Sequence, residues 1–151
     1  MATPDFWDDF VRVAKMSRSA MDEIMKRYGG RGGQNHILWA LYENDGLTPI
    51  EVARKLGIAA PTVAKMSSHM VVSGLITRQR DSVDRRRVHL YLTDRGREVK
   101  RPIEEATRKF RRATSAGLTL EERTVMSSAL AKIVRNLERP ARSPTLNELD
   151  R

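Results

Sequence analysis

A short charged run carries three consecutive arginines: Asp81-Ser82-Val83-Asp84-Arg85-Arg86-Arg87. Neighbouring guanidinium groups repel one another, so a folded protein gains little by placing them side by side. The minor groove of DNA, where it is narrow, has a negative potential that attracts arginine. Asp84 precedes the arginines, and we expect its carboxylate to orient a guanidinium through a bidentate pair. The run therefore predicts a contact with nucleic acid, and a solvated charge cluster is the alternative.

The positive charge of the chain is concentrated around this run. The 151 residues include 28 basic and 19 acidic side chains, a formal net charge of +9. Residues 78–112 contain thirteen of the basic and six of the acidic side chains, and so hold seven of the nine excess charges. Such a localised block indicates a polyanionic partner more strongly than a uniform excess does.

A second set of candidate contacts lies on a helix predicted for Pro61 to Ser73. Its apolar positions share one face, and the opposite face carries five candidate DNA contacts: Pro61, Thr62, Lys65, Ser68 and His69. Thr62 can reach a base edge, a thymine methyl group or a phosphate, and Lys65 can donate to guanine or to phosphate. An ordinary solvated face is the alternative interpretation.

The elements around these residues predict a winged helix-turn-helix. Thr48 to Glu51 form a capping box, and Gly57 ends the helix that it begins. The short turn before Pro61 forces two helices to cross steeply, as in a helix-turn-helix. Alternation then predicts strands at residues 75–78 and 88–92, with the loop 79–87 between them as a wing.

Helices are predicted on both sides of this region. The first runs from about Pro4 to Tyr28 with Thr3 as its N-cap, and its two apolar stripes indicate a core side and a dimer interface. A simple buried helix is the alternative. Further helices are expected at residues 34–43, at residues 94–114 with a kink or break at Pro102, and from a second capping box at Thr119 to about Glu138.

Two stretches resemble the MarR (multiple antibiotic resistance regulator) family. The wing is similar in the run Asp81-x-x-Asp84-Arg85-Arg86-x-Val88-x-Leu90-x-Leu92-Thr93-x-x-Gly96. The helix-turn-helix is similar from Leu47-Thr48-x-x-Glu51 through Pro61-Thr62-Val63 to Gly74-Leu75-Ile76. The resemblance covers residues 34–99. Ala59 and Ala60 stand where a serine often caps the recognition helix, and Lys65 and His69 stand where arginine is common.

The resemblance implies an obligate homodimer whose first and last helices intertwine. It implies that the Arg86 position enters the minor groove with support from Asp84, and that the positions of Pro61, Thr62 and Lys65 approach the major groove. It also implies a small aromatic or phenolic anion bound between the dimer region and the winged domain. We expect Arg18, Tyr28, His36 and Trp39 to line that pocket, with a satisfied core histidine as the alternative for His36.

Several kinds of chemistry find no support in the residues. The chain has no cysteine, which excludes disulfides and thiol chemistry. His36, His69 and His89 do not have the spacing of a helical zinc pair, and no nucleophile, base and orienting acid converge. We therefore expect no metal, no cofactor and no enzymatic activity. With no apolar run long enough for a membrane span and no secretory signal, we expect a cytoplasmic protein.

The sequence therefore predicts a mainly α-helical protein with a small β-hairpin wing. We expect an N-terminal dimerisation helix in residues 1–33, a winged helix-turn-helix in 34–99, C-terminal dimerisation helices in 100–139 and a mobile tail in 140–151. The expected function is binding of a near-palindromic double-stranded DNA operator, as a repressor relieved by a small aromatic ligand. The alternative is a winged-helix module that binds RNA or docks a protein and has no such ligand.

Overall fold

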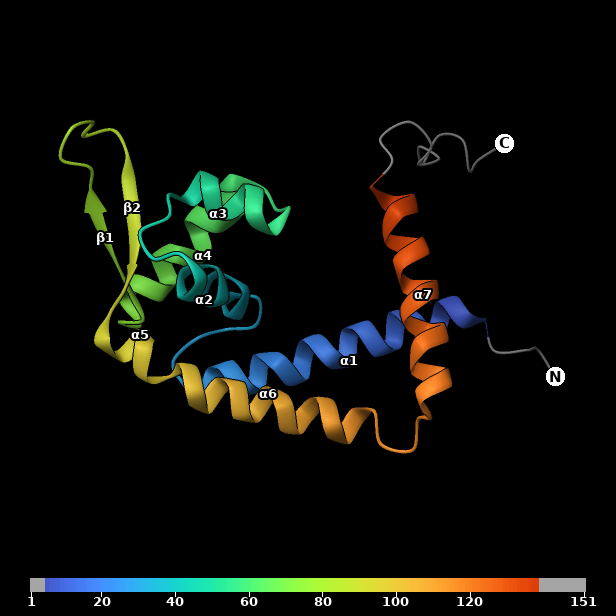
Figure 1. The fold of residues 1–151 in the computed structure, drawn as a ribbon. Helices are drawn as coiled ribbons and strands as arrows, with labels where there is room; N and C mark the ends of the chain where they lie inside the picture. Colours follow the sequence, from blue (N-terminus) through green and yellow to red (C-terminus); the bar gives the residue numbers. More distant parts are fainter. Residues whose placement is uncertain (1–4, 139–151) are drawn as a thin grey trace. The chain divides into compact units, whose positions relative to one another are not determined.

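The computed structural model describes residues 5–138 of the chain (Figure 1). Two predictions concern residues outside this range. They are the start of the first helix at Thr3 and Pro4, and the mobile tail at residues 140–151. Contacts divide the chain into two compact units, one up to Phe110 and one from Arg111. The elements are α1 (Phe6–Lys26), α2 (Gln34–Glu43), α3 (Pro49–Leu56), α4 (Ala60–Val72), β1 (Ile76–Arg80), β2 (Val88–Leu92), α5 (Asp94–Glu98), α6 (Lys100–Thr114) and α7 (Leu120–Leu137).

Helix α1 begins and ends inside the predicted range. Asp5 is the N-cap, since its carboxylate accepts a hydrogen bond from the backbone N–H of Trp7 at 3.1 Å, so the prediction of Thr3 as the cap was wrong. The helix ends at Lys26, before a turn in which Gly29 has a φ of +81°, a conformation that favours glycine. Of its residues only Ile24 and Met25 are buried.

The two helices of the helix-turn-helix form where the sequence predicts them. The Thr48–Glu51 capping box is complete, and Gly57 ends α3 with a φ of +65°. Helix α4 begins at Ala60, one residue before the predicted start. Its N-cap, Ala59, makes no side-chain hydrogen bond, so the helix lacks the cap that a serine would provide at this position.

The two strands form the predicted hairpin, but β1 is longer than expected. Ile76 pairs with Leu92 at one end and Arg80 with Val88 at the other, so Gln79 and Arg80 belong to the strand. The prediction had placed both residues in the loop because they are polar. Backbone pairing tolerates polar side chains where they face solvent, as these two do. On its other edge β2 pairs with residues 46–47, where Leu90 exchanges backbone hydrogen bonds with Gly46 and Leu47.

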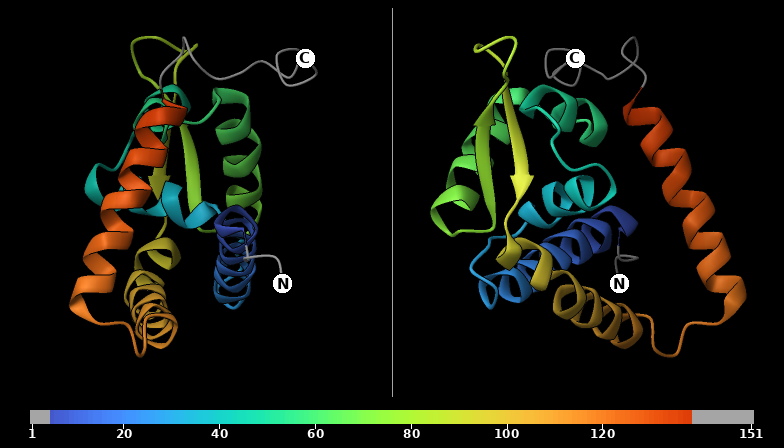
Figure 2. Two further views of the ribbon diagram at one scale, coloured as in Figure 1. Left: turned by 90° about the vertical axis from the view of Figure 1, so that its right-hand side faces the viewer. Right: turned by 60° about the vertical axis from the view of Figure 1, so that its left-hand side comes forward.

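A single apolar core holds the winged part together. It lies among α2, α3, α4 and the hairpin, which covers one side of the helices (Figure 2). Met25 of α1 and Ile103 of α6 also belong to it, so both flanking helices are anchored to the winged part at one end. The buried apolar residues of the core are Met25, Ile37, Leu38, Leu41, Val52, Ala53, Val63, Met70, Leu75, Ile76, Leu90, Leu92 and Ile103.

The helix predicted for residues 94–114 is interrupted as expected, but three residues before Pro102. Helix α5 ends at Glu98, Val99 forms a turn, and α6 begins at Lys100. A proline ring clashes with the carbonyl group four residues earlier, here that of Glu98, which explains the position of the break. Gly96 lies against the hairpin so closely that a Cβ atom would overlap the carbonyl oxygen of Leu75.

The second unit contains α7, which differs from the other long helices in burying nothing. Its capping box is complete, with Thr119 Oγ1 accepting from the backbone N–H of Glu122 at 3.2 Å. None of its residues is buried. Its exposed large apolar side chains are Leu120, Val125, Met126, Leu130, Val134 and Leu137.

Candidate nucleic-acid interface

Helix α4 separates a buried face from an exposed one, as predicted. Val63, Ser67 and Met70 are buried. Four of the five candidate contacts are exposed on the opposite side: Pro61, Thr62, Lys65 and Ser68. The arrangement leaves the N-terminal half of α4 free to approach a groove of DNA.

His69 departs from this arrangement. Its ring is half-buried, and Nδ1 lies 3.1 Å from the Nε2 atom of Gln34, a buried residue at the start of α2. It also lines a small hollow with Asp22, Lys26 and residues 29–31. His69 therefore differs from the other four candidate contacts, because its ring packs toward the glycine-rich turn after α1.

The wing presents its arginines to solvent. Arg85, Arg86 and Arg87 are all exposed, and the Arg86 side chain retains 97% of its accessible surface. Two backbone hydrogen bonds close the loop: Asp81 donates to the Arg87 carbonyl oxygen at 3.0 Å, and Arg87 donates to that of Asp84 at 2.9 Å. These hydrogen bonds fix the conformation of the loop backbone, while the three arginine side chains stay exposed to solvent.

Asp84 supports the wing differently from the prediction. Its Oδ1 atom accepts the backbone N–H of Arg86 at 3.1 Å, and the Nε atom of Arg86 lies 3.9 Å from the same oxygen. A bidentate pair needs both carboxylate oxygens, so that part of the prediction was wrong. Asp84 orients the backbone of the loop and makes only a long, exposed contact with the guanidinium.

Asp81 organises the base of the wing, a role that sequence reasoning missed. Its Oδ1 atom accepts from the backbone N–H groups of Val83 at 2.8 Å and Asp84 at 2.9 Å, and its Oδ2 atom lies 3.0 Å from Nε2 of His89. The hydrogen bonds from Asp84, Val83 and His89 lower the pKa of Asp81 to about 2. The Asp-x-x-Asp spacing contains a signal for this turn, since aspartate often accepts from backbone N–H groups two and three residues ahead.

His89 is placed between two acceptors. Its Nδ1 atom lies 2.7 Å from the Gly46 carbonyl oxygen, and Nε2 faces Asp81. Because neither partner can donate, both hydrogen bonds form only when the imidazole carries two protons. The Gly46 carbonyl oxygen, and then the Asp81 carboxylate, raise the pKa of His89 above its usual range. The histidine that was considered only as a metal ligand thus connects the wing to the turn before α3.

Arg54 is a further cationic residue that the sequence analysis did not single out. Together with Arg86 and Arg87 it lines a hollow of about 400 Å³ between the start of α3 and the wing. Glu51 is also part of this lining, but its carboxylate is engaged in the capping box. Arg54 lies on the exposed side of α3. Its position in the first helix of a helix-turn-helix was the sequence signal that could have identified it as a candidate DNA contact.

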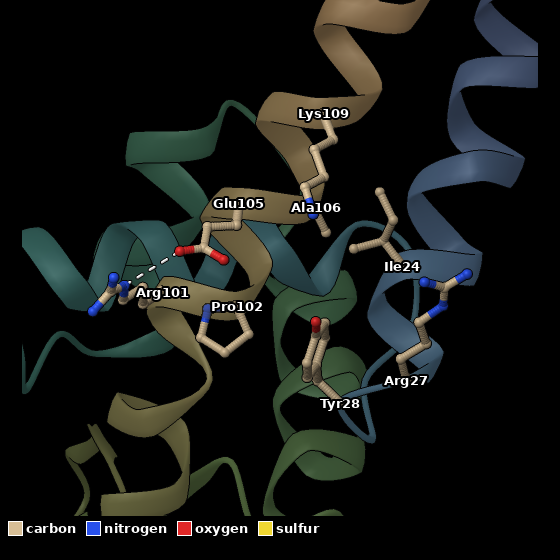
Figure 3. Close-up of a pocket in the computed structure, with 8 residues that line it drawn as sticks. All are labelled: Ile24, Arg27, Tyr28, Arg101, Pro102, Glu105, Ala106 and Lys109. Atoms are coloured by element: carbon tan, nitrogen blue, oxygen red, sulfur yellow. Dashed lines mark hydrogen bonds and ion pairs between the residues drawn. The ribbon is translucent and has the colours of Figure 1, made fainter.

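Of the four expected pocket residues, two line different hollows among residues 5–138. Tyr28 lines a partly open hollow of about 580 Å³ between the end of α1 and the start of α6 (Figure 3). Arg18 lines a different hollow farther back along α1. Neither hollow includes His36, which is exposed, or Trp39, whose ring packs against that of Tyr42 with centroids 5.2 Å apart.

The hollow beside Tyr28 is lined by cations that sequence reasoning did not assign to it. Arg27 and Lys109 line it from opposite helical segments, and Ile24, Pro102 and Ala106 supply apolar surface (Figure 3). Arg101 is paired with Glu105, the Nε and Oε1 atoms lying 3.3 Å apart. Pro102, which lines the hollow, was the sequence signal for an interruption of the helix in this region.

Two features of residues 5–138 bear on metal binding and on membrane crossing. Across that range no three histidine or acidic side chains are grouped so that they could hold a metal ion. Among the helices of the same residues, none has the length and apolar character that crossing a membrane requires.

Comparisons with known proteins agree with this geometry. The sequence profile of the MarR family matches residues 33–88, which include the helix-turn-helix and the wing. The transcriptional regulator TtmR of Methylorubrum extorquens is 31% identical over 110 residues, which are 73% of this chain and 55% of that protein. The transcriptional regulator MgrA of Staphylococcus aureus is 25% identical over 120 residues, 80% of each chain.

Solved structures show the same fold. A chain from the crystal structure of the S. aureus MepR–DNA complex superposes with a TM-score of 0.80 at 24% identity, over 90% of this chain and all of that one. At this identity the likeness shows the fold and not the function. The family match, the relatives that are helix-turn-helix transcriptional regulators and the shared winged-helix fold show that this chain belongs to the MarR family.

Proposed function

We propose that this chain regulates transcription as a homodimer that binds a near-palindromic site on double-stranded DNA. One observation carries the proposal: a single compact unit exposes both the outer face of α4 and a wing whose Arg86 is 97% exposed. A helix of this kind fits the major groove, and arginine on a hairpin fits the adjacent minor groove. MepR, which has the same fold, has been crystallised with DNA.

Each exposed residue has a distinct role in this proposal. Thr62 and Lys65 contact base edges in the major groove, where one good contact contributes about 1–3 kcal/mol of discrimination between bases. Arg86 enters the minor groove and responds to its width. Arg54 and Arg87 line the hollow between α3 and the wing, where they are placed to hold a phosphate group of the backbone.

Exposed apolar side chains support the dimer. On α1, Phe6 is 61% exposed, Trp7 47% and Val13 62%, and α7 exposes a second apolar set without burying any residue. Several large apolar side chains exposed on one helix indicate an interaction site in a protein that is otherwise strongly charged. A two-fold dimer places two α4 helices on half-sites about one helical turn of DNA apart.

Binding of genomic fragments, followed by footprinting, tests this function. We expect a protected site with dyad symmetry and a log–log salt dependence with a slope of about −0.9 per neutralised phosphate. Arg86→Ala should remove most specific binding and leave the dimer intact. Arg108→Ala removes the same charge from an exposed position on α6, outside the wing, and should leave binding nearly unchanged. Normal operator binding by Arg86→Ala, or a footprint without symmetry, would contradict the proposal.

The RNA-binding alternative predicts a different competition result. The major groove of an RNA duplex is deep and narrow and does not admit a helix, whereas that of B-DNA does. Duplex DNA should therefore displace a bound DNA probe at a salt concentration where an RNA duplex of the same sequence does not. Equal competition by the RNA duplex would favour the alternative.

A small aromatic anion is the ligand that the hollow beside Tyr28 fits best, and we propose that its binding relieves repression. The volume of about 580 Å³ is in the range of small-molecule sites. Arg27 and Lys109 offer positive charge for a carboxylate or phenolate, while Tyr28, Pro102 and Ala106 offer surface for a ring. Because α1 and α6 meet here, a bound ligand would change how the flanking helices hold the winged part.

Calorimetry with benzoate and its hydroxylated derivatives tests this assignment. We expect binding that is weakened at least about tenfold by Lys109→Ala, the effect of losing one charge-assisted contact. Arg18→Ala, in the other hollow, should bind as the unaltered chain does. A loss of binding with Arg18→Ala but not with Lys109→Ala would place the ligand in the hollow farther back along α1.

A further inference from the structure

The side chain of Arg78 joins the first strand of the wing to the middle of helix α4. Its Nη2 atom lies 2.9 Å from the Ala64 carbonyl oxygen, 2.8 Å from Oγ of Ser67 and 2.9 Å from Oγ of Ser68. A guanidinium Nη group has two N–H bonds, so the three acceptors share two protons. Arg78 is the middle residue of β1 and lies eleven residues from Ser67 in sequence.

The serines complete a closed network with this guanidinium. Ser67 donates its hydroxyl proton to the Ala64 carbonyl oxygen at 3.0 Å, and Ser68 donates to the same oxygen at 2.8 Å. Each hydroxyl oxygen then accepts from Arg78. The donor of Ser68 is therefore already used, so this residue is poorly placed to donate to a phosphate or a base edge, the role predicted for it from its exposed position.

The network spans the two parts of the molecule that must meet DNA together. Ala64, Ser67 and Ser68 lie on the turn of α4 that follows Thr62 and includes Lys65, while β1 leads directly into the wing loop. Reading two grooves at once requires a fixed spacing between helix and wing, and rigid supporting contacts provide it at the lowest entropic cost.

We propose that Arg78 is a positioning residue for DNA recognition, holding α4 and the wing at the spacing at which both contact their grooves. The inference rests on the proposed function. It assigns Arg78 no contact with DNA: its charge acts through Ser67, Ser68 and the carbonyl group of Ala64. Loss of Arg78 therefore weakens binding to the specific site and leaves binding to random duplex nearly unchanged.

Arg80 provides a matched control on the same strand. It carries the same charge, lies two residues along and hence on the same face of β1, and is exposed. No hydrogen bond or ion pair of its side chain occurs among residues 5–138. Removal of a charge that contacts only phosphate weakens specific and non-specific binding alike and reduces the salt slope by about one.

The test measures the affinities of Arg78→Ala and Arg80→Ala for the operator and for random duplex, over a range of salt concentrations. We expect Arg78→Ala to lower the ratio of specific to non-specific affinity at least about tenfold, the scale of one charge-assisted hydrogen bond, with the salt slope for random duplex unchanged. Arg80→Ala should leave that ratio within about twofold. An equal loss on both duplexes with Arg78→Ala would overturn the proposal and make Arg78 a phosphate contact.

A double-mutant cycle with Ser68→Ala supplies a second, independent readout. If Arg78 acts through the serines, the double variant should bind the operator no more weakly than Arg78→Ala alone, whereas independent contacts would add. Ser68 is exposed, so if Arg78→Ala does not fold, Ser68→Ala alone tests the network through the same ratio of specific to non-specific affinity, which it should lower. Additive losses would overturn the proposal. Absence of specific DNA binding by the unaltered chain would instead contradict the proposed function.

Discussion

The two capping boxes of this chain begin helices whose apolar side chains have different surroundings. At both, threonine accepts from the backbone N–H of a glutamate three residues ahead, at 3.3 Å for Thr48 and 3.2 Å for Thr119. After the first box, α3 buries Val52 and Ala53 in the core. After the second, α7 buries no residue and leaves Leu130 and Val134 41% and 50% exposed.

The difference shows that local signals begin a helix but do not stabilise it by themselves. An isolated helix of this length is marginal in water, and most helical stability comes from packing an apolar face. The winged part contains its own core, whereas α7 leaves its apolar side chains exposed. We therefore propose that the winged part is the unit that binds DNA and that α7 packs against a partner subunit.

The largest expected effect comes from charging the apolar face of α7. Leu130→Asp combined with Val134→Asp places two carboxylates where the proposed dimer excludes water, and an unpaired buried charge costs several kcal/mol. We expect the dimer to dissociate at micromolar concentration and cooperative operator binding to be lost, as measured by sedimentation velocity and gel shift. Ser128→Asp, on another face of α7, is the control. A stable dimer of the double variant would remove α7 from the interface.

A smaller effect is expected from the protonation of His89 at the base of the wing. The partners of this ring raise its pKa, so its contribution to the wing is fully present at low pH and is lost as pH rises through the raised value. The positive charge of Arg87 disfavours protonation of His89, whereas the negative charge of Glu51 on α3 favours it. We expect operator affinity to fall several-fold between about pH 6 and pH 8.5, with the winged core still folded.

The control for this pH dependence is His89→Gln, which cannot titrate. Its operator affinity should be lower at acidic pH and nearly constant across the range, while His36→Gln, at an exposed position, should retain the full dependence. The ¹⁵N shifts of the His89 ring provide a direct readout of both protons. An unaltered pH profile in His89→Gln would show that the wing does not depend on this ring.

The smallest effects should distinguish the two capping boxes themselves. Thr48→Ala and Thr119→Ala each remove one N-cap, worth about 1 kcal/mol of helix stability. Thr48 is only 7% exposed and its helix belongs to the core, so its variant should lower the free energy of unfolding of the whole winged part. Thr119→Ala should affect hydrogen exchange in α7 alone. Equal effects on global unfolding would show that both helices fold as one cooperative unit.

Much of the winged part could be predicted because its signals are local. The capping box at Thr48, the glycine at 57 and the alternation in residues 88–92 each act within one turn or one strand, and each is confirmed. The length of β1 was missed because pairing with β2 decides it, and polar residues such as Gln79 pair as readily as apolar ones where they face water. The break near Pro102 was predicted, but its position at Val99 follows from the carbonyl group that the ring displaces.

By itself the sequence determined the order of the elements, the exposed face of α4 and a cationic wing, since these depend on spacing along the chain. Only the tertiary structure decided which polar groups meet: His89 with Gly46, 43 residues away, Arg78 with Ser67 and Ser68, and Tyr28 with the start of α6. The physical reason is that periodicity reports which side of an element faces the core. Contacts between elements depend on how those faces pack, and no local pattern contains that information.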